Sequence, residues 1–236
     1  LNLGGTAIGN TINATPEYLE NITAFVSEEV GIAFTQADDL FDATQNVDGF
    51  VRVSAAIKTA AVNLSKMSND LRLLSSGPKA GIGEINLPAK QNGSSIMPGK
   101  VNPVIPEVVS QVAFRVIGND LTITMAAESG QLELNAFEPI IFHSLFESID
   151  CLTHAVATLT ANCITGIQAN EMICYKQVEE SAGIATALCP TIGYQKASAI
   201  AKESLETGKT VRELVLEKGL LTIAETDSIL DLKHMA

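Results

Sequence analysis

The segment between residues 48 and 75 contains two rows of apolar residues, and each row repeats every seven residues. The second row lies three positions after the first. Two apolar rows with this period and this offset form the seam of a helix that packs along its whole length. The rows are Phe50, Ile57, Leu64 and Leu71, and Val53, Ala60, Met67 and Leu74. The sequence therefore predicts one long helix here, packed inside a bundle.

Two further segments are rich enough in apolar residues to form long buried helices. The first is predicted to begin at Asn102–Pro103 and to end near residue 128, because Asn is a favoured N-cap and Pro a favoured first helical residue. The second covers about 136–165, and Gly166 ends it. The chain has no Trp and only 5% aromatic residues, so Ala, Val, Ile and Leu must build the core.

The predicted helices become short after about residue 171. They cover about 194–207, 211–218 and 224–232. Thr210 and Thr222 are predicted N-caps, and Thr222 with Glu225 fits a capping box. A strand pattern is visible only over residues 82–87. The predicted fold is all-α: a long-helix bundle over residues 1–172, followed by a small helical C-terminal domain over residues 173–236.

The charge and the cysteines exclude several classes of protein. A net charge of −12 argues against non-specific nucleic-acid binding, which depends on cationic contacts to phosphate. A small dianionic substrate remains possible, because a few local cations can reverse the field inside a cleft. Four separated cysteines and three histidines argue against a metal site, and they suit a reducing compartment. We therefore expect a cytoplasmic protein without a nucleic-acid, membrane or metal partner.

One loop, residues 93–102, calls for a chemical explanation. Its sequence, GSSIMPGKVN, places two hydroxyls, an ammonium and an amide directly before a helix N-terminus. Free backbone N–H groups and the helix dipole attract anions there. Its glycines match neither nucleotide-binding pattern. From the residues alone, Lys100 and Asn102 could hold a carboxylate, or the loop could be a hinge with a solvated lysine and a capping asparagine.

The loop resembles the signature of the aspartase/fumarase superfamily, G-S-S-x-M-P-x-K-x-N, and agrees with it at all seven specified positions. Residues 4–9, 69–72 and 81–85 also resemble the family, so the resemblance covers essentially the whole chain. Residues 104–107 read Val-Ile-Pro-Glu, where fumarases tend to have Thr-Gln-Cys-Glu. This difference favours the aspartase branch of the superfamily.

The resemblance implies elimination of ammonia from L-aspartate to give fumarate, without a cofactor. Ser94 would be the general base that removes the C3 proton, and Ser95 would bind the carboxylate that becomes the doubly charged aci form. Lys100 and Asn102 would bind the α-carboxylate. Glu107 would pair with a histidine of another subunit, although it also suits the first turn of a helix in its own right.

The resemblance further implies a homotetramer in which three subunits contribute to each active site. The chain opens at Leu1 without an initiator Met and resembles the C-terminal half of such an enzyme, so we expect it to be inactive by itself. Its own histidines are not expected to be catalytic. His143 and His154 lie about three turns apart on one helix face and are expected to pack in the core, while His234 lies near the C-terminus.

Two alternatives remain at this point. A fumarase, which hydrates fumarate to malate, would need the same Ser94 and Lys100. A non-catalytic helical oligomerisation module would need only the long heptad helices, and its loop would be a relic.

Overall fold

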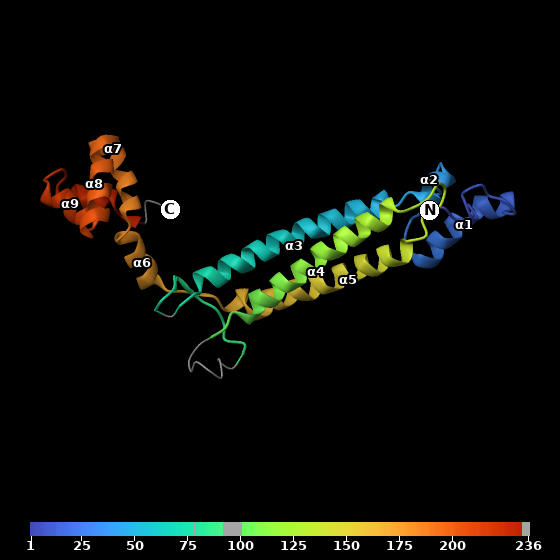
Figure 1. Cartoon of the computed structure of the whole chain (residues 1–236), viewed down its shortest axis with the longest axis horizontal. Helices are drawn as coiled ribbons and strands as arrows, with labels where there is room; N and C mark the ends of the chain where they lie inside the picture. Colours follow the sequence, from blue (N-terminus) through green and yellow to red (C-terminus); the bar gives the residue numbers. More distant parts are fainter. Residues whose placement is uncertain (78, 92–100, 233–236) are drawn as a thin grey trace. The chain divides into compact units, whose positions relative to one another are not determined.

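The computed structural model describes residues 1–77, 79–91 and 101–232. Among these residues the regular structure is helical except for one sheet of two short strands, which confirms the predicted all-α class. Two compact units are present (Figure 1). The long-helix unit comprises residues 1–73 and 87–167, and the short-helix unit comprises residues 74–86 and the chain from Gln168 on. No helix in the described ranges has the length and apolarity that a membrane span requires.

The long-helix unit has three long helices, α3, α4 and α5, which run side by side (Figure 1). Two shorter helices precede them. In chain order the five are α1 (Pro16–Val30), α2 (Leu40–Gln45), α3 (Asp48–Leu74), α4 (Val104–Glu128) and α5 (Glu138–Asn162). The three long helices lie within two or three residues of their predicted ends, because the apolar period continues up to the residues that stop each helix.

The core of the long-helix unit is built from small and branched aliphatic residues, as the composition predicts. Its fully buried residues include Ala61, Val109, Ala113, Ile123 and Ile141. The first heptad row of α3 packs against these helices. The second row does not, since Val53 is 48% exposed and Met67 is 47% exposed. The predicted two-row seam is therefore only half formed within this chain.

Polar contacts also join the long helices. The buried carboxylate of Asp120 on α4 accepts hydrogen bonds from Ser54 Oγ at 2.8 Å and Lys58 Nζ at 2.5 Å, both on α3. Asn119 donates to Glu147 Oε2 on α5 at 2.8 Å. This bond, together with those from Arg115, holds the pKa of Glu147 below its ordinary value. A buried charge is costly unless it is paired, so these contacts fix the register of α4 against its neighbours.

The predicted core packing of His143 and His154 is wrong for this chain. Both residues are exposed on α5, and the side chain of His154 is 77% exposed. The spacing does place them on one face, but that face is not the apolar one. His143 lies two residues after the buried Ile141, which is roughly 200° around the helix at about 100° per residue.

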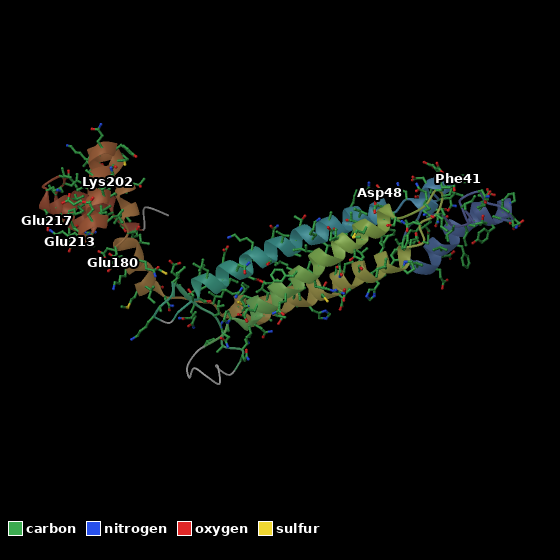
Figure 2. All side chains as sticks on the ribbon, in the orientation of Figure 1. Phe41, Asp48, Glu180, Lys202, Glu213 and Glu217 are labelled. Atoms are coloured by element: carbon green, nitrogen blue, oxygen red, sulfur yellow. The ribbon has the colours of Figure 1, made fainter. Side chains whose placement is uncertain are left out.

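The short-helix unit packs around a core of its own. This core includes Leu188, Ile200, Val211, Leu214 and Val215. Its helical elements are α6 (Glu171–Glu179), η2 (Ala182–Leu188), α7 (Cys189–Ile192), α8 (Tyr194–Thr207), α9 (Val211–Glu217) and α10 (Ile223–Ile229). Charged side chains, among them Glu180, Lys202, Glu213 and Glu217, project from its surface (Figure 2).

The predicted caps of the short helices are confirmed, although α10 ends at Ile229, three residues before its predicted end. Thr222 and Glu225 form the predicted capping box of α10, and Thr210 caps α9 in a second box with Glu213. Gly208 ends α8 in the left-handed conformation, with φ of 72°. Caps of this kind satisfy backbone groups that a short helix cannot pair internally.

A segment from before the signature loop packs into the short-helix unit. Strand β1 (Ile85–Asn86) pairs antiparallel with β2 (Gln168–Ala169), which follows the 3₁₀ turn η1 (Ile164–Gly166). The sequence indicated a strand over residues 82–87 but not its partner. The predicted division at residues 172 and 173 remains a prediction, and the compact units differ from it by including residues 74–86 with the C-terminal helices.

Candidate active site

Three of the predicted site residues, Ser94, Ser95 and Lys100, lie outside the described residues. Asn102 and Glu107 are described, and both lie at the start of α4. The site can therefore be built from the segments that flank the signature loop on each side.

The start of α4 differs from its prediction by one position. Pro103, rather than Asn102, occupies the N-cap position, and it has no side chain that could accept a capping hydrogen bond. The ψ angle of Pro103 is 57°, which is not helical, so the regular helix begins at Val104. The predicted capping role of Asn102 is therefore wrong. The half-buried Asn102 lies directly before a helix N-terminus, whose first N–H groups have no partners within the helix.

Glu107 lies in the first turn of α4, where its charge suits the helix dipole. Its carboxylate Oε1 lies 3.8 Å from Nη2 of Arg72, in the last turn of α3. Arg72 also donates to Asn69 Oδ1 at 3.3 Å. The sequence did not predict this ion pair, although residues 69–72 resemble the family. Both side chains are about two-fifths exposed, so the pair orients the carboxylate more than it stabilises the fold.

One apolar cluster supports the flanks of the loop. Its buried members are Val109, Ala155, Leu159 and Cys163. Leu87, upstream of the loop, and Ile105, downstream of it, both pack against this cluster. Burial raises the pKa of the Cys163 thiol, which keeps it protonated and unreactive. The segments before and after the loop therefore pack against the same apolar cluster.

The described part of the site can bind an anion. The N-terminus of α4 and the guanidinium of Arg72 supply positive charge, and Asn102 supplies an amide. Among the described residues, no group of three or more His, Cys, Asp or Glu side chains could hold a metal ion.

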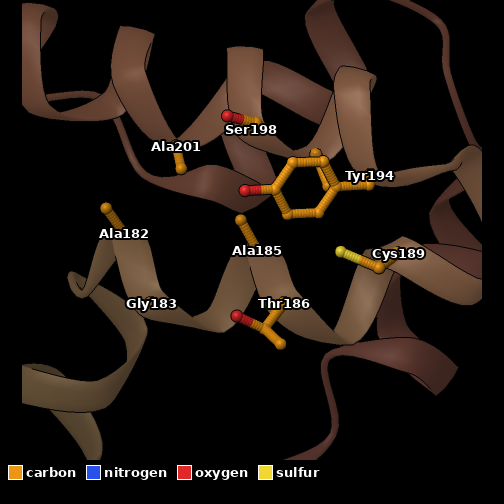
Figure 3. Close-up of a pocket in the computed structure, with 9 residues that line it drawn as sticks. Ala182, Gly183, Ala185, Thr186, Cys189, Tyr194, Ser198 and Ala201 are labelled. Atoms are coloured by element: carbon orange, nitrogen blue, oxygen red, sulfur yellow. The ribbon is translucent and has the colours of Figure 1, made fainter.

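A separate pocket of about 330 Å³ lies within the short-helix unit. The ring of Tyr194 lies across it, and the sulfur of Cys189 points toward that ring (Figure 3). The lining residues are Ala182, Gly183, Ala185, Thr186, Cys189, Tyr194, Ala197, Ser198 and Ala201. Because this lining includes no Lys, Arg or His side chain, the pocket does not suit a dicarboxylate.

Comparison with known proteins decides which family the chain belongs to. A family model described as "Lyase" matches residues 1–118, and one described as "Fumarase C C-terminus" matches residues 184–236. The chain belongs to the aspartase/fumarase superfamily of lyases. The resemblance of the signature loop to this superfamily is thereby confirmed at the level of the family.

Individual members of the superfamily are similar over the whole chain. An aspartate ammonia-lyase from Helicobacter pylori is 54% identical over 235 residues, covering 100% of the chain and 50% of the relative. A fumarate lyase:delta crystallin structure from Brucella melitensis has a TM-score of 0.95 at 51% identity, covering 100% of this chain and 51% of that one. A class II fumarase structure from Schistosoma mansoni has a TM-score of 0.91 at 33% identity, covering 98% and 51%. The chain spans about half the length of the curated relatives that it matches.

Proposed function

We propose that this chain is part of an aspartate ammonia-lyase, which reversibly eliminates ammonia from L-aspartate to give fumarate. The observation that carries the proposal is the complete signature within a chain that is 54% identical to an aspartate ammonia-lyase and 33% identical to a fumarase. A signature alone would fit either reaction. The difference in identity favours elimination of ammonia.

In the proposed mechanism Ser94 removes the C3 proton of L-aspartate. A serine hydroxyl is a weak base, so its alkoxide must be stabilised by the ammonium of Lys100 and the positive end of α4. The electron pair left at C3 moves into the adjacent carboxylate and forms the aci dianion, which Ser95 binds. Donors placed where this charge develops supply most of the rate acceleration. The pair of the aci dianion then returns to form the C2=C3 double bond, the C2–N bond breaks, and ammonia leaves with the pair of that bond.

The binding groups follow from the same arrangement. Lys100 and Asn102 bind the α-carboxylate, and the position of Asn102 directly before α4 supports its part in this. Glu107 pairs with a histidine of another subunit, and Arg72 orients its carboxylate within this chain. The elimination transfers no electrons to an acceptor, so its chemistry requires no redox cofactor.

The assembly that we propose is a homotetramer with shared active sites. Apolar residues on the outer side of α4 support it: Phe114 is 62% exposed, Leu121 is 61% exposed and Met125 is 58% exposed. Their spacings of seven and four residues place them on one helix face. A monomer rarely exposes such a stripe unless a partner covers it. All four cysteines are free thiols, which supports a cytoplasmic location.

A chimera tests the proposed function. This chain replaces the matching half of the Helicobacter pylori aspartate ammonia-lyase, and fumarate is measured by its ultraviolet absorbance. We expect turnover of L-aspartate by the chimera and none by the chain alone. Ser94→Ala should lower kcat by at least roughly 10²–10⁴, the usual contribution of general base catalysis. Ser198→Ala, a serine of the short-helix unit, is the matched control and should leave kcat unchanged. Full activity of the Ser94→Ala chimera would refute the role of Ser94 and favour the non-catalytic module.

A fumarase is the second candidate, because the C-terminal family model is that of fumarase C. The chimera and the natural protein that contains this chain should both be assayed with L-malate as well as L-aspartate. Fumarate formed from malate faster than from aspartate would replace the proposed reaction with hydration.

A further inference from the structure

The polypeptide that leads into the signature loop is held by the C-terminal part of the chain. We call residues 81–86 the strap. In sequence the strap follows α3 and ends at Asn86, seven residues before the signature loop begins at Gly93. In the fold it belongs to the short-helix unit. Its partners on α6 are about 85 to 95 residues away in sequence. The proposed mechanism gives these partners no role.

One face of α6 binds the strap through hydrogen bonds to its main chain. Asn170 is the N-cap of α6, and Cys174 and Gln177 follow it at spacings of four and three residues, so the three lie on the same side of the helix. Together they reach the carbonyl oxygens of three consecutive strap residues. The bonds are Gln177 Nε2 to Ile82 O at 2.8 Å, Asn170 Nδ2 to Gly83 O at 2.6 Å, and Cys174 Sγ to Glu84 O at 3.5 Å. These three bonds all hold the main chain of the strap.

Asn170 makes the most of these contacts. Besides its bond to Gly83, its backbone N–H donates to the carbonyl oxygen of Glu84 at 2.8 Å, and its Oδ1 accepts from Nδ2 of Asn86 at 2.5 Å. A single side chain thus contacts both ends of residues 83–86. Gly83 has φ of +65°, a conformation that glycine adopts without strain, so the main chain can present its carbonyl to Asn170.

The other side of the strap is fixed by the end of α3. The N–H of Glu84 donates to Leu74 O at 2.9 Å, and that of Ile82 donates to Ser76 Oγ at 3.0 Å. At Gly81 a Cβ would lie 2.4 Å from the carbonyl carbon of Ser76, so the two backbones are too close for any side chain there. The strap is therefore clamped from two sides, and Leu87, which follows it, packs against the cluster beneath the loop flanks.

We propose that Asn170 is a positioning residue for the elimination, because it fixes the strap from which the chain runs into the loop that carries Ser94. The inference rests on the proposed function. Asn170 does not touch substrate; it sets where the upstream flank begins, while Ile105 fixes the downstream flank on the same cluster that Leu87 packs against. A loop anchored at only one flank would hold its base less accurately, and a displacement of about 1 Å can cost roughly 100-fold in rate.

The test measures kcat and KM of the chimera carrying Asn170→Ala. We expect kcat to fall roughly 10- to 100-fold, and by more than KM rises, since proton abstraction depends on the position of Ser94 more than binding does. Asn170→Asp keeps an oxygen that can accept from Asn86, but it has no N–H to donate to the carbonyl oxygen of Gly83. This variant should therefore lower kcat as well. Asn170→Asp also provides the test if Asn170→Ala fails to fold.

Thr222→Ala is the matched control. Thr222 caps α10 within the short-helix unit and forms its hydrogen bonds with Glu225 and Thr226, so this variant weakens the unit without loosening the clamp. If Thr222→Ala lowers kcat as much as Asn170→Ala does, or if both Asn170 variants keep wild-type kcat, the inference is wrong. Wild-type kcat with Thr222→Ala and a reduced kcat with Asn170→Ala supports it.

Hydrogen exchange of the chain by itself separates this inference from the proposed function. Asn170→Ala should speed exchange of the strap amides roughly ten-fold, as expected when a local hydrogen bond is lost. If the wild-type chimera fails to act on aspartate, the proposed function fails, while faster exchange still shows that Asn170 fixes the strap. Unchanged exchange overturns the inference whatever the activity.

Discussion

The long-helix unit and the short-helix unit reach a folded state in different ways. The short-helix unit closes a compact apolar core within this chain and caps its helices with two Thr–Glu boxes. The long-helix unit has three separate small clusters and several large apolar residues exposed on α3, α4 and α5. The difference teaches that the short-helix unit gathers its buried apolar residues into one core, whereas the long-helix unit divides them among three clusters and leaves apolar faces for the proposed partner subunits to cover.

The largest effect is expected at the exposed apolar face of α4 in the long-helix unit. Phe114→Ser combined with Leu121→Ser should dissociate the proposed tetramer, because each buried side chain of this size contributes about 1.5–3 kcal/mol. Light scattering and sedimentation of the chain measure the assembly. Leu205→Ser is the control, since Leu205 is 78% exposed on the short-helix unit and should leave the assembly intact. Dissociation by Leu205→Ser, without dissociation by the double variant, would show that the short-helix unit supplies the contact between subunits.

The next effect concerns the closed core. Leu188 is fully buried, and Leu188→Ala should destabilise the short-helix unit by about 2–5 kcal/mol through lost burial and the cavity left behind. Hydrogen exchange resolved along the sequence should show faster opening over α8 and α9. Exchange over α4 and α5 should stay as it is. Equal acceleration of both units would show that they unfold together.

A smaller loss is expected from the polar contact between α3 and α4. Asp120→Ala removes a carboxylate whose side chain is only 9% exposed and leaves Lys58 without that partner. Because Lys58 is 39% exposed and can reach water, we expect a loss of about 2–3 kcal/mol, at or below the low end for a buried pair. Urea unfolding measures it. Replacing all three side chains, Ser54→Ala and Lys58→Met with Asp120→Leu, should be close to neutral, and a large loss there would contradict this account.

The smallest effect depends on pH. Hydrogen bonds from the backbone and side chain of Thr222 lower the pKa of Glu225 below 4.5. A depressed folded-state pKa contributes stability above the ordinary value, and that contribution is lost as the pH falls through the folded pKa. Glu225→Gln should therefore melt slightly below wild type at neutral pH, and the gap should close as the pH falls below 4.5. A gap that widens on acidification would contradict the assignment.

Helix positions were predictable where periodicity and caps agreed. The heptad rows placed α3 to within one residue of Leu74, and Thr222 with Glu225 placed the start of α10. These signals are local, since a cap or a seven-residue repeat depends on neighbours in sequence. The family of the chain was predictable for a similar reason, because the signature is one continuous run of residues.

Features that depend on distant partners were not predictable. Periodicity shows that a helix face is apolar but not what covers it, so it could not show that Val53 and Met67 are exposed here. The strand pattern over residues 82–87 could not identify Asn170 as a partner, because Asn170 bonds to a main-chain carbonyl group, which every residue possesses. The pair of Arg72 and Glu107 joins two helices across the loop, and nothing in either segment specifies the other. The roles of Ser94, Ser95 and Lys100 remain proposals.

The clamp on the strap also bears on how such a chain is made. Asn86 and the Asn170 that holds it are separated by 84 positions, and a ribosome releases them in that order. Segments nearer the N-terminus fold first during synthesis, and distant pairings form late because a long loop must close before they gain any stabilisation. The upstream approach to the signature loop is thus completed only after α6 has emerged. A nascent polypeptide can assemble its long helices well before it has a finished catalytic centre.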